Sequence, residues 1–85
     1  MLRVYADTAY REPMTQLELL AEVALLRDPP ERGLVRGQVG TVVEVLSPHA
    51  VEVEFSDDDG RTYATAALGT EDLVRLHHAP LEQVA

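Results

Sequence analysis

The chain has 85 residues and a formal charge of −8, from fifteen acidic and seven basic side chains with the histidines neutral. It contains no cysteine, which excludes disulfide bonds, zinc bound through thiolates and thiol chemistry. The acidity makes nucleic acid an unfavourable partner, because such binding rests on a basic patch, and favours solubility or a basic protein partner. No apolar run is long enough to span a bilayer and no signal-peptide core opens the sequence, so we expect a cytoplasmic protein without membrane association.

The first thirteen residues are expected to extend from a more compact domain. Leu2 and Val4 alternate with more polar neighbours, which fits an added edge strand, an arm that docks on a neighbour or a simple extension. Leu2, Val4 and Tyr5 would otherwise lie exposed on a strand with unpaired edge groups, so we hypothesise a homodimer formed through this segment. The expected parts are an extension (1–13), a domain (14–79) and a C-terminal tail (80–85).

The next stretch, which ends at the double proline 29–30, fits both a helix and a strand. Thr15 followed by Glu18 matches a capping box and favours a helical turn over residues 15–20. Periodicity alone does not separate helix from strand over residues 15–21. We expect the helical turn there and a strand over residues 22–26, which the two prolines end.

Two runs further along the chain alternate apolar residues with glutamate, over residues 43–45 and 51–55. This period of two is typical of strands with one buried and one solvated face. Ser-Pro-His at residues 47–49 predicts the turn between them. If all the glutamates share one face, the parity of the pairing places Glu44 opposite Glu52.

The later elements follow from turn and cap signals. Residues 56–61 contain three aspartates and Gly60, which predicts a turn with Gly60 in a left-handed conformation. A strand should follow over residues 61–68. Thr70 before two acids predicts the N-cap of one short helical turn, and residues 73–78 fit a last strand.

Five short strands with this spacing predict a mainly β fold, a small closed or half-open SH3-like barrel with an N-terminal extension and one short helical turn. Glycines in the stretch before residue 41 should let the chain turn tightly and enter a strongly bent strand without Cβ clashes. The predicted structural glycines are Gly33, Gly37, Gly40 and Gly60.

Three segments carry a resemblance to a family: "ALLRDPPERGLVRGQVGTVVEV", "AVEVEFSDDDGRTYATAAL" and "EDLVRL". Over residues 22–76 the chain resembles a small bacterial family of unknown function, DUF4926. The resemblance implies an SH3-like fold and gives no established activity or catalytic residues. The chain departs from the family pattern at Pro29, where leucine is common, and at Gln38, where an acid is common.

A weaker similarity is to the KOW motif of ribosomal and transcription-elongation proteins, at Gly37, Gly40, Val42 and Val45. That motif usually has basic surroundings, which this chain lacks. The alternative function is therefore a KOW-like nucleic-acid or ribosome-associated module. It requires four arginines to converge on one face: Arg32, Arg36, Arg61 and Arg75.

No constellation in the sequence predicts catalysis, a cofactor or a metal. The aspartate run does not match an EF-hand loop, because the first and last ligand positions would be Phe55 and Ala66. His77 and His78 point to opposite faces of a strand and cannot share one metal ion. Ser47 near His49 lies in an exposed turn without an orienting acid. We therefore expect a protein that is not an enzyme and holds no cofactor or metal.

The candidate partner-binding residues are Glu44, Glu52, Glu54 and Tyr63, which are expected to share the solvated face of the sheet. A tyrosine among carboxylates is typical of an interface anchor. The alternative is that Arg61 or Arg75 neutralises these acids as part of an ordinary surface. From these features the sequence predicts a non-enzymatic protein-interaction module, for example an antitoxin or immunity protein that binds a basic protein partner.

Overall fold

The computed structural model describes residues 17–78, so the predictions for residues 1–16 and 79–85 lie outside it. In this part of the chain the elements are five strands and one short 3-10 turn. In chain order they are β1 (Glu22–Leu25), β2 (Val39–Ser47), β3 (Ala50–Ser56), β4 (Thr62–Gly69), η1 (Thr70–Asp72) and β5 (Leu73–Arg75). No helix in residues 17–78 is long and apolar enough to cross a membrane.

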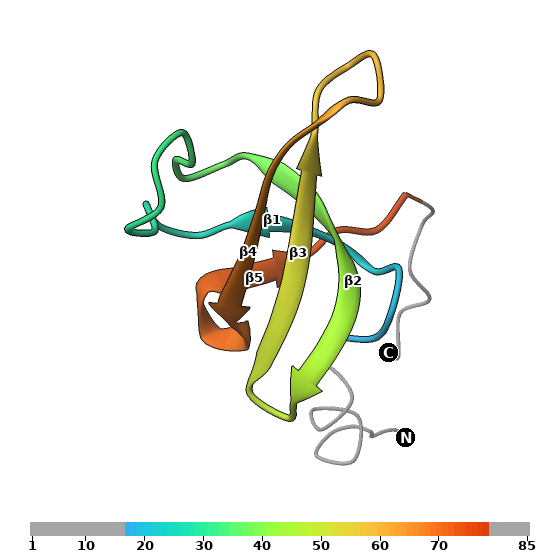
Figure 1. The fold of residues 1–85 in the computed structure, drawn as a ribbon. Coiled ribbons are helices and arrows are strands. Elements are labelled where there is room, and N and C mark those ends of the chain that lie inside the picture. The colour runs from blue at the N-terminus through green and yellow to red at the C-terminus, as the bar shows by residue number, and fades with distance from the viewer. Residues whose placement is uncertain (1–16, 79–85) are drawn as a thin grey trace, which may run out of the picture.

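The strands form one antiparallel sheet in the order β4-β3-β2-β1-β5. Strand β2 curves and pairs with β3 from Gly40 to Ser47, while its first residues, Val39 to Thr41, also pair with β1 on the other side (Figure 1). The mainly β class and the five strands are confirmed. Because β4 and β5 do not pair within residues 17–78, the described sheet is open and is not a closed barrel.

The core lies on one face of the sheet, where alternate residues of each strand point inward. In β3, Val51, Val53 and Phe55 are at most 1% exposed, while the glutamates between them are only partly covered. This alternation follows directly from the period of two in the sequence. The buried residues are Leu17, Ala21, Val23, Leu25, Leu34, Val42, Val51, Val53, Phe55, Ala66, Leu68 and Leu73.

Gly40 allows β2 to cross the core closely. A Cβ atom at this position would lie 2.6 Å from Cγ1 of Val53 and 2.9 Å from both the carbonyl oxygen of Glu54 and Cδ2 of Phe55. Steric space, and not a left-handed backbone, therefore requires glycine here. The other predicted structural glycines do adopt positive φ: Gly33 (82°), Gly37 (94°) and Gly60 (82°).

The described end of the predicted helical turn at residues 15–20 is not helical. Leu19 and Leu20 form a tight turn, which the N–H of Ala21 closes by donating to the carbonyl of Glu18 at 3.1 Å. Pairing with β2 overrides the local helix signal, because Leu20 N–H donates to the carbonyl of Val42 at 2.7 Å. The geometry leaves Leu20 with a φ of 71°, which is unfavourable for a residue that carries a Cβ.

The hairpin between β2 and β3 confirms the predicted register at Glu44, which lies opposite Glu52. The connection is shorter than predicted, because Ser47 already pairs with Ala50 and only two residues form the turn. Irregularities between Val42 and Glu44 and between Val45 and Ser47 absorb the difference.

The predicted turns after β3 are formed, with one difference at the short helix. The Asp57 carboxylate accepts the N–H groups of Asp59 and Arg61, both at 2.9 Å, which fixes the turn that contains Gly60. The predicted N-cap at Thr70 is wrong, because Thr70 is the first residue of η1 and Gly69 is its N-cap, without a side-chain cap. Thr70 N–H instead donates to the carbonyl of His49 at 2.9 Å.

Candidate functional site

The acidic face, defined here as Glu44, Glu52 and Glu54, lies on the side of the sheet away from the core. Glu44 and Glu52 are direct cross-strand partners, and Glu54 lies opposite Thr41 one row further along β3. Glu52 and Glu54 alternate with buried Val51, Val53 and Phe55, and Glu44 lies on the same face as its partner Glu52. The sheet therefore places the three carboxylates together, with Cβ atoms of opposed residues about 5 Å apart.

The arginines of the described part are engaged elsewhere or lie in loops. Arg75 makes a two-pronged ion pair with Glu18, with N–O distances of 2.8 and 2.6 Å. Arg27 Nε lies 3.0 Å from a carboxylate oxygen of Asp72. Within residues 17–78 no ion pair includes a member of the acidic face. Its one side-chain hydrogen bond in this part comes from Thr62, which donates to Glu54 at 2.8 Å.

Tyr63 is not brought together with the three glutamates. Its ring centroid lies 6.4 Å from that of buried Phe55, and its hydroxyl accepts a hydrogen bond from the Gln38 amide at 3.1 Å. The cause is an irregularity in the β3–β4 pairing, in which Phe55 faces Ala64 but Ser56 faces Thr62. The extra residue is Tyr63, which is 46% exposed and whose ring lies beside that of Phe55.

Gln38, one of the departures from the family pattern, has a structural role. Its side-chain oxygen accepts the N–H of Val35 at 2.5 Å while its amide nitrogen donates to Tyr63. A carboxylate could accept the first bond but could not donate the second. The amide therefore joins the loop before β2 to the start of β4.

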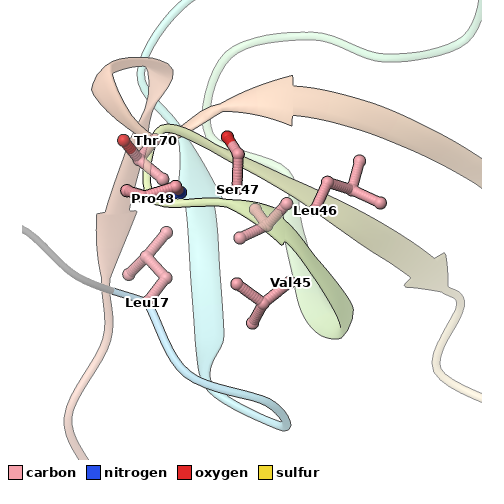
Figure 2. A pocket seen from close by; sticks show the side chains of 7 residues that line it. Leu17, Val45, Leu46, Ser47, Pro48 and Thr70 are labelled. Atoms are coloured by element: carbon pink, nitrogen blue, oxygen red, sulfur yellow. The ribbon is translucent and has the colours of Figure 1, made fainter.

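A second surface feature is an apolar hollow at the end of the β2–β3 hairpin, with a volume of about 310 Å³. Leu17 faces the hairpin from the chain segment that precedes β1, while Val45, Leu46 and Pro48 form the opposite wall (Figure 2). The remaining lining residues are Ser47, Val51 and Thr70. Val45 pairs with buried Val51, yet 49% of it is exposed. The core face is thus uncovered at this end within the described residues.

Sequence reasoning did not find this hollow. It placed Val45 in a buried row, because strict alternation would turn Val43 and Val45 toward the core. The irregularity between Val42 and Glu44 buries Val42 in place of Val43, while Val45 stays opposite Val51 on the core face but is exposed within the described residues. The available signal was the pair Val45-Leu46, since two consecutive apolar residues do not fit a regular half-buried strand.

The histidines lie in two places, His49 in the β2–β3 turn and His77 and His78 after β5. His78 Nε2 is hydrogen-bonded to the Glu22 carboxylate, and the N–H of His49 donates to the Ser47 hydroxyl at 3.1 Å. Residues 17–78 contain no group of three or more His, Asp or Glu side chains placed to hold a metal ion.

These features define a small, mainly β domain with a five-stranded antiparallel sheet, one acidic face and an apolar hollow at a hairpin end. The chain belongs to the family described as Domain of unknown function (DUF4926), whose model matches residues 19–75. This confirms the family resemblance found in the sequence. No curated protein and no solved structure matches the chain.

Proposed function

We propose that this chain is a non-enzymatic protein-interaction module that binds a basic protein partner through its acidic face. The supporting observation is the direct opposition of Glu44 and Glu52, with no cation of the described part paired to either. Like charges directly opposed cost roughly a few tenths of a kcal/mol. A partner that presents lysine or arginine would replace this repulsion by attraction and would be steered toward the face by the net charge of −8.

Within this class we propose the neutralising half of a bacterial two-protein system, such as an antitoxin or an immunity protein. Small size, acidity and the lack of a catalytic constellation in the sequence support this role. An acidic face of this kind suits a partner whose active surface is basic, because covering that surface would block its approach to other anions.

The test is affinity purification from the native host at low salt with matched variants. The face variant is Glu44→Gln/Glu52→Gln/Glu54→Gln. The control, Glu31→Gln/Asp58→Asn/Asp59→Asn, removes the same charge from exposed loop positions. We expect the wild type and the control to capture one stoichiometric protein that the face variant fails to retain. Absence of such a protein, or equal capture by the face variant, contradicts the proposal.

The antitoxin role has its own readout. The captured partner, expressed alone, should arrest growth, and co-expression of the wild-type chain should relieve the arrest. The face variant should not relieve it. If the captured partner has no effect on growth, the antitoxin role is contradicted, while the proposal of a protein-interaction module is not.

A further inference from the structure

The outer edge of β4 is a free strand edge in the part of the chain that the structure describes. β4 pairs with β3 on one side only, and it lies at one end of the strand order (Figure 1). From Ala64 to Gly69 its pairing with β3 is regular, so the outward backbone groups of this stretch keep the alternation that an added antiparallel strand requires. Alternate N–H and C=O groups of the stretch point away from β3.

This edge lacks the features that usually protect edge strands. Proteins block such edges with lysine, proline, bulges or very short strands. β4 has 8 residues, TYATAALG, without a charge or a proline. Its one irregularity lies at the Tyr63 end. The opposite edge of the sheet, β5, has only 3 residues and offers a much shorter ladder.

We propose that the edge of β4 is the docking site for an extended segment of a basic protein partner, which adds to the sheet as one more strand. This inference rests on the proposed function, because it names the binding mode of the same partner. Backbone hydrogen bonds to β4 would give affinity, and side chains at alternate positions would give specificity.

The residues on the outward face of β4 explain why the partner should be basic. Thr65 lies opposite Glu54, and Ala67 lies opposite Glu52. Their side chains are short, so they leave the path to both glutamates open. A residue on the added strand would be two strand spacings, about 10 Å, from these glutamates. Arginine or lysine at two alternate positions can lie across Thr65 and Ala67 and reach the two carboxylates.

The other face of the added strand requires different residues. Ala66 and Leu68 point to the core and are buried, and Ala64 packs against the same cluster. Partner side chains at the intervening positions would extend this apolar layer, so they should be small or apolar. The structure therefore specifies an alternating basic and apolar segment, whereas a merely basic tail would satisfy only the carboxylates.

The test uses the full-length protein and labelled peptides about as long as β4. The first peptide alternates arginine with valine. The second has the same composition with its arginines grouped together. The third repeats the first with alternate backbone nitrogens methylated, which removes donors without a change of charge. Binding is measured by fluorescence anisotropy, and hydrogen exchange of the β4 amides is measured with and without peptide.

We expect the alternating peptide to bind and to slow exchange of the β4 amides that point away from β3 by about tenfold or more. The methylated and grouped peptides should bind at least about fivefold more weakly, and Glu52→Gln/Glu54→Gln should weaken the alternating peptide by a similar factor. The control variant Asp58→Asn/Asp59→Asn should bind as the wild type does.

Three results would overturn this inference. Equal binding of all three peptides shows simple charge attraction, and the proposed function then stands without the added strand. Protection, in the free protein, of the β4 amides that point away from β3 shows that the chain itself or a second copy already covers the edge, and loss of that protection on dilution identifies the second copy. Failure of every peptide, while capture from the host still depends on the acidic face, places the partner elsewhere on that face.

Discussion

Substitution of Gly40 by alanine tests the packing at the point where β2 crosses the core. The new Cβ would lie less than 3 Å from three atoms, two of them on Val53 and Phe55, which are fully buried, and one on the backbone of β3. Neither side chain has free space to move into, and the backbone oxygen is fixed by sheet pairing. Such overpacking costs roughly 2–4 kcal/mol. A domain of this length is typically stable by about 4–13 kcal/mol, so the loss is a large fraction of the total.

The matched control is Gly69→Ala, at the end of β4. Gly69 has φ −72° and ψ 141°, and a Cβ there would meet its nearest neighbours at 3.8 Å or more. Alanine should be neutral or stabilising by up to about 1 kcal/mol, through the entropy of the unfolded chain.

Urea unfolding followed by far-ultraviolet circular dichroism measures both variants. With a slope of about 1 kcal/mol per molar urea, Gly40→Ala should lower the midpoint by about 2 M or more. If Gly40→Ala unfolds at the same urea concentration as Gly69→Ala, the reasoning from close packing is refuted.

Four further results are expected. Glu44→Gln should raise the free energy of unfolding by about 0.2–1 kcal/mol, because it removes a like charge opposite Glu52; a loss of stability in urea would show that a cation neutralises the pair. Asp57→Ala should cost about 1–2 kcal/mol in the same assay through two lost hydrogen bonds in the turn, while Asp58→Ala should cost little. Light scattering should find a dimer for the full-length protein and a monomer after deletion of residues 1–13; a monomeric full-length chain ends the homodimer hypothesis. Anisotropy with single-stranded and duplex RNA should detect no binding at about 50 mM salt, where phosphate contacts are strongest, and measurable affinity would revive the KOW-like alternative.

The sequence was most informative where a regular alternation of apolar and polar residues extended over a whole strand. The alternation of residues 51–55 predicted β3, its buried face and the position of Glu52 and Glu54 on the other face. Turn chemistry was equally direct at Gly60, because a glycine after three aspartates has few other structural uses. Both signals come from residues close together in the sequence. The structure contains the β3 strand and the turn as predicted, because the strands beside β3 also place apolar residues on the core face.

Features that depend on more than one segment were not predictable in this way. The helix signal at residues 15–20 gave way to the turn at Leu20, since the chain there pairs with Val42, which is more than twenty residues away. Tyr63 does not lie with the acidic face as predicted, because β4 has one more residue than β3 between two paired positions. A single inserted residue reverses the face of a side chain, and no local pattern marks where the insertion occurs.

The choice of glutamate on the outer face is not explained by the fold. Glutamate is depleted in strands relative to threonine or the β-branched apolar residues, and opposed carboxylates add repulsion. Threonine at Glu44 or Glu52 would satisfy the same solvated positions at a lower cost, as Thr41 on β2 and Thr65 on β4 do on either side of Glu54. Solubility alone could be served by acids in the loops, which already carry Glu31 and the aspartate turn. Glu52 and Glu54 lie instead on β3, next to the uncharged edge strand β4, and this position is the one that a basic added strand would reach.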